Sequence, residues 1–306
     1  MPGSQDFASD PRNERVLIYV NGEMLPREHA KVSVFDAGFV LGDGIWEGIR
    51  LHKGALLFEE AHLQRLFEGC RAIALDIGMS REEVSLALRR TLVANEMVTG
   101  VHIRLMVTRG IKKAPNQDPR NAVGQPTVVI VAEHKEPSPE IVGRGLVLAT
   151  SIIRCTPSSM FDMRLNSHSR LNLIRALLDV IKLGADEALM LDPHGSVSSC
   201  NATNFFLVRR GEVYTSTGEY CFNGVTRGNI IALCHANRIP IHLTDFSLDE
   251  VYEADEAFVT GTFGGVTQVR EIDGRVLRGG VPGAMTSRLR ALYEQLKDSE
   301  AVRSHG

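Results

Sequence analysis

The sequence predicts an α/β fold made of two domains or of one large α/β unit. Segments with strand-like alternation of apolar residues, such as VHIRLMVT, are interleaved with segments whose apolar residues recur every three or four positions. A polar connector, HKEPSPEIVGRG, separates two such series near the middle of the chain. The 306 residues, 43% of them hydrophobic, suffice for a sizeable core.

The first series lies before the connector. We expect residues 1–15 to form a flexible, polar tail without the apolar core of a signal peptide. Val16–Pro26 is typical of a hairpin with Asn21-Gly22 as its turn. Lys31–Phe35 is strand-like, and the glycine-rich stretch Asp36–Gly44 predicts a loop. The elements predicted next are a helix over Phe58–Ile77, a helix capped by Ser80, and strands over Val101–Gly110 and Thr127–Glu133.

The second series begins after the connector with the strand-like segment GLVLATSI. A loop entering a helix follows over Arg164–Gly184, and several short strands with glycine turns come next. The chain ends in a helix over Gly283–Lys297. We therefore predict a small domain over residues 16–133, a connector over residues 134–144 and a large domain over residues 145–306.

Charge and composition exclude several classes of function. The net charge is −3, so nothing indicates a nucleic-acid or anionic-membrane partner, and no apolar run is long enough to span a bilayer. The five cysteines lack metal-site spacing, so we expect no metal. An odd cysteine count without a secretion signal fits reduced thiols, and we expect a cytoplasmic protein.

One stretch, NGVTRGNI at residues 223–230, carries a candidate binding site. Gly224 permits a tight turn, Thr226 offers a hydroxyl, and a helix follows. A turn that presents backbone N–H groups at a helix N-terminus can bind phosphate. The alternative is an ordinary helix start capped by Thr226.

Seven segments, in this order, resemble the class IV aminotransferases, which are fold-type IV enzymes dependent on pyridoxal 5'-phosphate. The segments are FDAGFVLGDGIWEGIR, AHLQRL, VHIRL, GADEALMLDPHGSV, NATNFFLV, NGVTRGNI and ADEAFVTGTFGGVTQV. The resemblance spans Val16 to about Leu296. It implies two α/β domains, the larger with a barrel-like β core, a cofactor pocket between them, and a homodimer.

The resemblance also implies a cup for the cofactor phosphate. Its members are Arg65 of the AHLQRL segment, Val225 and Thr226 of the turn, and Thr262 of the TGTF segment. A guanidinium fork, two hydroxyls and backbone donors suit a dianion. This favours a ligand role for Arg65 over a solvated surface charge.

The family lysine that forms the internal aldimine has no counterpart here. The family places it ten to twelve residues before the position of Ala176, a window that holds Arg164, Leu165 and Asn166. The chain has 7 Lys against 27 Arg, and none of the lysines lies between Lys135 and Lys182. We take Arg164 as the equivalent position, although a guanidinium stays protonated and is no nucleophile.

Two further positions around the cofactor ring differ from the family. Arg170 aligns with the tyrosine that binds the ring oxygen, and Ser199 aligns with the glutamate that pairs with the ring nitrogen. Asn204 matches the family. Two guanidinium groups, on Arg164 and Arg170, favour a more anionic ligand. Ser199 can bond the nitrogen but holds its proton less well than a carboxylate.

Substrate contacts are also implied by the resemblance. Phe39 and Trp46 flank the first glycine loop and would line one side of the pocket, and Gly261 and Phe263 flank Thr262. Arg104 matches an arginine near the acidic end of the substrate; a strand arginine that reaches solvent is the alternative.

Two functions follow as hypotheses. The first is amino-group transfer between an amino acid or amine and a 2-oxo acid, with pyridoxal phosphate as the cofactor and altered residues around its ring. The second is a lysine-less homologue that binds pyridoxal phosphate, or another phospholigand, without a covalent link. A wrong offset in a variable loop is the third explanation of the missing lysine, but no nearby lysine supports it.

Overall fold

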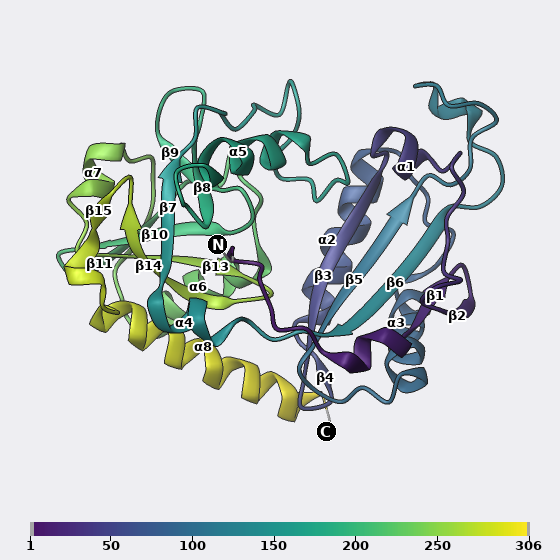
Figure 1. Cartoon of the computed structure of the whole chain (residues 1–306), viewed down its shortest axis with the longest axis horizontal. Coiled ribbons are helices and arrows are strands. Elements are labelled where there is room, and N and C mark those ends of the chain that lie inside the picture. The colour runs from purple at the N-terminus through teal and green to yellow at the C-terminus, as the bar shows by residue number, and fades with distance from the viewer. Residues whose placement is uncertain (1–2, 305–306) are drawn as a thin grey trace. The chain divides into compact units, whose positions relative to one another are not determined.

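The computed structural model describes residues 3–304, without the side chains of residues 278 and 279, and divides the chain into two compact units (Figure 1). The larger unit contains Pro137–Arg164 and Leu171–Lys297, with the segment that ends at Ala8. The smaller unit contains Ser9–Glu136, Leu165–Arg170 and the segment that begins at Asp298. No helix among the described residues is long and apolar enough to cross a membrane.

The smaller unit is an antiparallel sheet with helices on one face. Its strands are β1 (Leu17–Val20), β2 (Glu23–Pro26), β3 (Gly44–His52), β4 (Ala55–Leu56), β5 (Val101–Thr108) and β6 (Thr127–His134). Its helices are η1 (Pro11–Arg15), α1 (Ala37–Leu41), α2 (Glu59–Ala72), α3 (Arg81–Ala94) and η2 (Pro119–Asn121). The strand order is β2-β1-β6-β5-β3-β4, with α2 packed against β3 and α3 against β1 and β6 (Figure 1).

Strict alternation along β5 separates the two faces of this sheet. Ile103 and Leu105 are fully buried and belong to the core under the helices, whereas His102 and Arg104 are only half-buried on the opposite face. Gly48 of β3 stands directly opposite Arg104 in the register. This second face therefore carries the polar side chains of the unit, and Gly48 adds no side chain to it beside Arg104.

The hairpin over Val16–Pro26 is confirmed, and the two stretches after it differ from expectation. Asn21 and Gly22 adopt φ values of 48° and 100°, as the tight turn requires. The stretch 31–35 is not a strand, because no strand pairs with it. The predicted glycine loop contains α1, which Asp36 caps by accepting a hydrogen bond from the Gly38 N–H and which Gly42 ends at φ 70°.

The expected flexible tail is partly folded. Residues Pro11–Arg15 form η1, and the side chain of Asn13 is buried. Its amide group bonds the backbone of His134 at 2.8 Å in both directions. These two hydrogen bonds of the Asn13 amide fix residues 11–15 to the end of β6. The polar composition of the tail does not reveal this contact.

The larger unit is a curled mixed sheet. Its strands are β7 (Leu146–Thr150), β8 (Glu187–Leu191), β9 (Val197–Cys200), β10 (Asn204–Arg209), β11 (Glu212–Thr215), β12 (Ile241–Leu243), β13 (Glu256–Gly261), β14 (Gly265–Ile272) and β15 (Arg275–Val276). The order is β12-β11-β10-β13-β14-β7-β8-β9, with β15 paired to β14. The last strand of this order, β9, also packs against β10, so the sheet curls back on itself. The predicted α/β class with a barrel-like core is confirmed.

Helices complete the larger unit. They are α4 (Pro139–Arg144), α5 (Leu171–Ile181), α6 (Val225–Ala236), α7 (Leu248–Tyr252), η3 (Leu277–Gly280) and α8 (Ala284–Arg303). α5 packs against β8, and α6 packs against β12 and β13. The start of α8 is fixed by the buried carboxylate of Glu256, which accepts hydrogen bonds from the Thr286 N–H and hydroxyl, both at 2.8 Å. The packing of α6 on β13 positions the candidate site.

Candidate active site

The N-terminus of α6 begins at its N-cap Gly224. Among the described residues no side chain caps it, and its first turn contains no acidic residue. The backbone N–H groups and dipole of a helix start attract an anion. Thr226, in the first turn, is buried, and its hydroxyl lies 3.4 Å from the Tyr293 hydroxyl of α8. The alternative of a start capped by Thr226 does not hold, because the N-cap is the residue before Val225.

Asn204 holds this turn against the sheet. Its amide nitrogen donates to the Phe222 carbonyl at 2.6 Å, and its amide oxygen accepts from the Gly224 N–H at 3.2 Å. A Cβ at position 224 would come within 2.5 Å of that oxygen. Glycine is therefore required for the close approach of the turn to Asn204. The prominent NGVTRGNI segment is organised around this contact.

Two threonines lie at the same end of the sheet. Asn204 is paired directly with Thr260 in the β10–β13 register, and Thr262 follows in the tight turn between β13 and β14. The Thr260 hydroxyl is buried without a hydrogen-bond partner among the described residues, and Thr262 is half-buried. An orphaned buried hydroxyl beside an uncapped helix start indicates a polar ligand. These features fit a phosphate group.

Arg227 anchors the same turn from the other side. Its guanidinium donates to the Ser216 carbonyl at 2.6 Å and to the Asn223 side chain at 3.1 Å. Burial lowers the pKa of Arg227, yet its contacts are all to neutral oxygens. Its positive charge therefore adds to the potential at the start of α6.

Ser199 is engaged within the protein. Its hydroxyl donates to the Thr203 carbonyl at 2.9 Å and lies 3.3 Å from the Asn204 amide nitrogen, which donates to it. The side chain is buried on β9. The Ser199 hydroxyl thus already donates one hydrogen bond and accepts another. The ring nitrogen of a bound cofactor would have to displace one of these two contacts. The role of Ser199 toward a cofactor stays a prediction.

Arg65 belongs to the smaller unit, where a buried carboxylate binds it. The guanidinium of Arg65 donates to the two oxygens of Glu47 at 2.8 and 2.7 Å, and the Nδ1 atom of His62 lies 2.7 Å from the second oxygen. Glu47 is fully buried. Burial alone would raise the pKa of Glu47, but attraction and hydrogen bonds from Arg65, together with His62, hold it below its ordinary value. The phosphate role of Arg65 stays a prediction.

Sequence inspection missed Glu47 and His62. The sequence did contain a signal for this pair. Glu47 alternates with apolar residues on the core face of a strand, and the next helix carries His62 and Arg65, which are three positions apart and so lie on one face. An acid on the core face needs a cationic partner, because a buried unpaired carboxylate is costly.

The segment at residues 166–168 runs along the free edge of β3. The Trp46 N–H donates to the Asn166 carbonyl, the His168 N–H donates to the Gly44 carbonyl, and Ile45 and Ser167 form a β-bridge. Residues directly opposite in an antiparallel pair share a face. Asn166 and His168 therefore share the polar face of the sheet with Trp46 and Arg104.

The three positions of the expected lysine window differ in environment. Arg164 is 51% exposed and forms a local ion pair with Asp162, with a shortest N–O distance of 2.8 Å. Asn166 is 3% exposed, and its side-chain oxygen accepts a hydrogen bond from Arg170. Leu165 packs against the core of the smaller unit. The assignment of Arg164 as the lysine equivalent stays a prediction, and burial favours Asn166.

The seven lysines of the chain lie elsewhere. Within the larger unit they are Lys182, 72% exposed beside Asp179, and Lys297, paired with Glu294 at 2.6 Å. Lys112 of the smaller unit is buried, with its amine bonded to the Asp118 carbonyl. The hydrogen bonds and ion pairs of Lys112, Lys182 and Lys297 are thus made to residues outside the Asn204 turn and the Asn166 segment. The residues present thus fit the phosphate of pyridoxal phosphate but not its covalent attachment.

The predicted substrate residues separate into exposed and buried ones. Phe39 is 70% exposed on α1, whereas Phe263 is buried in the turn that holds Thr262. Gly261 ends β13, and a Cβ there would touch the Thr203 methyl group at 3.4 Å. Arg104 stacks on Trp46, with its guanidinium carbon 3.7 Å from the ring centroid. The substrate roles stay predictions.

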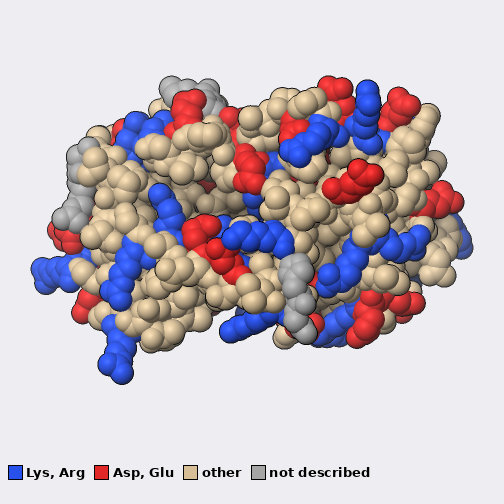
Figure 2. Space-filling model, turned by 90° about the horizontal axis from the view of Figure 1, so that it is seen from below, with Lys and Arg blue, Asp and Glu red and all other residues tan. Residues whose placement is uncertain are grey.

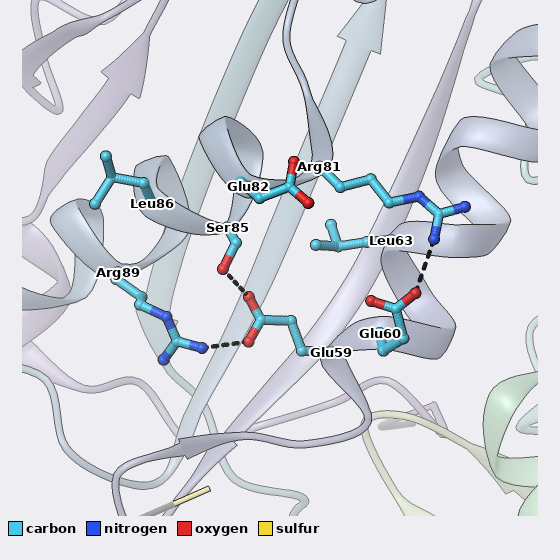
Figure 3. Close-up of a pocket in the computed structure, with 8 residues that line it drawn as sticks. All are labelled: Glu59, Glu60, Leu63, Arg81, Glu82, Ser85, Leu86 and Arg89. Carbon is cyan, nitrogen blue, oxygen red and sulfur yellow. Dashed lines mark hydrogen bonds and ion pairs between the residues drawn. The ribbon is translucent and has the colours of Figure 1, made fainter.

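A shallow hollow between α2 and α3 is separate from these residues. Its volume is about 440 Å³, and Figure 3 shows its charged lining, in which Glu59 contacts Ser85 and Arg89 while Glu60 contacts Arg81. Each of these two carboxylates already faces an arginine, and Glu82 adds a third carboxylate to the lining, so the hollow does not offer the positive charge that a phosphate would need. On the face that Figure 2 shows, blue and red side chains are interspersed rather than gathered into one basic patch.

No group of three or more His, Cys, Asp or Glu side chains within residues 3–304 could hold a metal ion. All five cysteines are buried and free. Burial is the main cause that raises the pKa of Cys155 to about 12. These thiols are therefore structural rather than reactive.

Comparison with known proteins identifies relatives over nearly the whole chain. The model of the family "Amino-transferase class IV" matches residues 44–272. A "Branched-chain-amino-acid aminotransferase-like protein 1" of Arabidopsis thaliana is 39% identical over 95% of this chain and 52% of its own length. The chain thus spans about half the length of that relative. A branched-chain-amino-acid aminotransferase of Pseudomonas aeruginosa is 32% identical, with 92% of each chain covered.

A solved structure agrees with this. The T.th. branched-chain amino acid aminotransferase complexed with N-(5'-phosphopyridoxyl)-L-glutamate superimposes with a TM-score of 0.86 at 28% identity, covering 94% of this chain and 95% of that one. The predicted class IV fold is therefore confirmed.

Replacing Arg65 should expose the dependence of Glu47 on it. We expect Arg65→Ala to lower the free energy of unfolding by about 3 kcal/mol, because it leaves the buried Glu47 carboxylate with His62 but without its guanidinium partner. Adding Glu47→Gln should restore more than half of the loss, which urea denaturation measures. The control Arg81→Ala breaks an exposed pair and should cost less than about 1 kcal/mol. A loss of less than about 0.5 kcal/mol in Arg65→Ala would contradict the role of this pair.

Proposed function

The chain belongs to the class IV aminotransferases, and from this premise we propose that it binds pyridoxal 5'-phosphate by its phosphate group, without a covalent link, alongside a small amino acid, amine or 2-oxo acid. The observation that carries the proposal is the uncapped start of α6. Gly224 has no side chain, so the turn before this helix can approach Asn204 closely. The family uses pyridoxal phosphate, and a relative of the same fold was solved with a phosphopyridoxyl compound.

The residues of the larger unit that would bind the phosphate have separate roles in this proposal. The first-turn N–H groups of α6 and the Thr226 hydroxyl would donate to phosphate oxygens, and the Thr262 hydroxyl would approach from the β13–β14 turn. Asn204 positions the turn and does not itself need to touch the ligand. Bound pyridoxal phosphate supplies an electron sink for a carbanion.

Amino-group transfer is the second candidate function, and membership of the family favours it. Against it stands the absence of a lysine among the residues that surround the cup and the Asn166 segment. A lysine is the nucleophile that links the cofactor and moves the substrate proton in this chemistry. We therefore expect the unaltered chain to transfer amino groups slowly or not at all.

Reduction with borohydride distinguishes the two functions. We expect bound pyridoxal phosphate to absorb like the free aldehyde, to leave on dialysis and to resist fixation by borohydride, because no amine is placed to form a reducible bond with it. Thr226→Val should weaken binding by about tenfold, the value of one charge-assisted hydrogen bond, whereas Thr244→Val at an exposed site should leave it unchanged. A reduced cofactor found on a peptide of this chain would reject the non-covalent proposal in favour of an ordinary aminotransferase.

Restoring an amine at the buried position provides a gain-of-function test. The resemblance implies that a lysine of the window 164–166 reaches the cofactor, so we expect Asn166→Lys to become fixed to it by borohydride. The guanidinium group of Arg170 beside this position would lower the pKa of the lysine and keep its amine nucleophilic. The matched variant Arg164→Lys, at a half-exposed position bound to Asp162, should remain unfixed. Peptide mass spectrometry reads out both. Fixation in Arg164→Lys alone would show instead that residue 164 faces the cofactor.

We also propose that the chain forms a homodimer, as its resemblance to the family implies. An apolar stripe on α5 supports this: Leu171, Ile174, Leu178 and Ile181 are 52–68% exposed at helical spacing. Sedimentation should give a dimer or a multiple of one, and Ile174→Glu should shift the equilibrium toward monomer. A parent protein that sediments only as monomer at micromolar concentration would contradict the proposal.

A further inference from the structure

One tyrosine of α8 contacts both segments of the larger unit that would bind the phosphate. Tyr293 is 4% exposed, and its hydroxyl lies 3.4 Å from the hydroxyl of Thr226 in the first turn of α6. Its ring lies beside Gly265, the first residue of β14 after the turn that holds Thr262. Tyr293 thus contacts the start of α6 with its polar end and the β13–β14 turn with its ring.

The glycine at position 265 permits the contact between the turn and the ring. Gly265 adopts φ 61° and is paired with Gly261 on the other side of the turn. A Cβ on Gly265 would lie 3.3 Å from a carbon of the Tyr293 ring, which is closer than ordinary packing allows. A side chain at this position would therefore strain the backbone and push the turn away from α8.

The packing of α8 fixes the position of Tyr293. Thr286 and Tyr293 are both buried and lie two helical turns apart on the same face of α8. Thr286 is bonded to the carboxylate of Glu256 on β13, and the Nε atom of Arg290 donates to the Val266 carbonyl of β14 at 3.1 Å. Hydrogen bonds to both strands that flank the turn thus hold α8 against it.

The number of hydrogens in the hydroxyl pair determines which residue donates when a phosphate is bound. Each hydroxyl carries one hydrogen and two acceptor sites, and either of the two can donate in the absence of a ligand. If Thr226 donates its one hydrogen to a phosphate oxygen, the hydrogen between the two hydroxyls has to come from Tyr293.

Such a bond from Tyr293 would improve Thr226 as a donor in two ways. It would restrict the rotation of the Thr226 hydroxyl, which lowers the entropy cost of orienting it toward a ligand. It would also polarise that hydroxyl, because hydrogen bonds in a chain strengthen one another. The separation of 3.4 Å is long for two hydroxyls, and we expect it to shorten when a phosphate accepts from Thr226.

We propose that Tyr293 is a positioning residue for the phosphate: it donates to Thr226, directs the hydrogen of that threonine to the phosphate, and supports the β13–β14 turn with its ring. Tyr293 itself does not need to touch the ligand. The inference rests on the proposed function where the phosphate belongs to pyridoxal phosphate, whereas the phosphate group of another ligand would use the same contact.

The variant Tyr293→Phe tests this role, because it removes the hydroxyl and keeps the ring beside Gly265. Calorimetry should show that pyridoxal phosphate and inorganic phosphate each bind about fivefold more weakly than to the parent. Pyridoxal, which has the same ring without the phosphate, should bind equally to both proteins. The control Tyr252→Phe removes another hydroxyl of the larger unit, one bonded to Asp273 at 2.8 Å, and should leave all three affinities unchanged.

A double-mutant cycle distinguishes positioning through Thr226 from a general effect on the fold. Thr226→Val alone should weaken pyridoxal phosphate binding about tenfold, and adding Tyr293→Phe should cost nothing more, because the hydroxyl that Tyr293 orients is absent. Independent effects would instead multiply to about fiftyfold. Thr226→Ser keeps the hydroxyl, so adding Tyr293→Phe to it should again weaken binding about fivefold.

The outcomes separate this inference from the proposed function. Equal binding of pyridoxal phosphate by the parent and Tyr293→Phe, or losses that multiply in the cycle, would overturn the role of Tyr293 and leave the proposed function standing. Inorganic phosphate binding that depends on Tyr293, in a parent protein that does not bind pyridoxal phosphate, would reject the proposed function and support the inference. A parent protein that binds neither compound would reject both.

Discussion

The positive end of α6 has no side-chain cap among the described residues and no acidic residue in its first turn, and the candidate site depends on this constraint. Gly224 brings the turn within hydrogen-bond reach of Asn204, so a side chain at that position would separate the helix start from the sheet. Thr226 lies in the first turn of α6, and the orphaned hydroxyl of Thr260 belongs to the residue paired with Asn204 in the sheet. A protein that buries polar donors without acceptors loses stability unless a ligand satisfies them. These features support our proposal that the start of α6 binds a phosphate group.

Two arginines of the smaller unit have different partners. Arg65 is neutralised by a buried glutamate on the helix-covered face, where it contributes to stability. Arg104 stacks on Trp46 on the other face and has no acidic partner among the described residues. The difference follows from strand alternation, because neighbouring residues of β3 present Trp46 to one face and Glu47 to the other. Two adjacent positions of β3 thus contact different arginines: Glu47 neutralises Arg65, and Trp46 stacks with Arg104.

The sequence predicted the fold well because its signals are local and repeated. The hairpin at Asn21-Gly22, the capping box at Ser80 and the alternation along β5 all appear as expected. The α6 start was also found from NGVTRGNI, since glycine, threonine and a following helix are recognisable without tertiary information. The stretch 31–35 was misjudged, because strand formation needs a pairing partner that propensity does not reveal.

Site residues that depend on tertiary contacts were harder to predict. A resemblance gives an approximate offset, so it could not distinguish Arg164, held by Asp162, from Asn166, buried beside Arg170. The resemblance places Arg164 and Arg170 together at the family's lysine and tyrosine positions, whereas in the structure Arg170 lies near Trp46, on which Arg104 also stacks. Glu47 was overlooked because its partners lie on a separate helix. In each case the deciding fact is which face of an element a side chain occupies relative to a segment distant in sequence.

A crystal structure of the protein soaked with pyridoxal phosphate would test the central claim most directly. The account predicts phosphate density at the start of α6, in contact with Thr226 and Thr262, and a gap between the aldehyde carbon of the ring and every side chain. Continuous density from the ring to a lysine, or a phosphate bound away from α6, would contradict it.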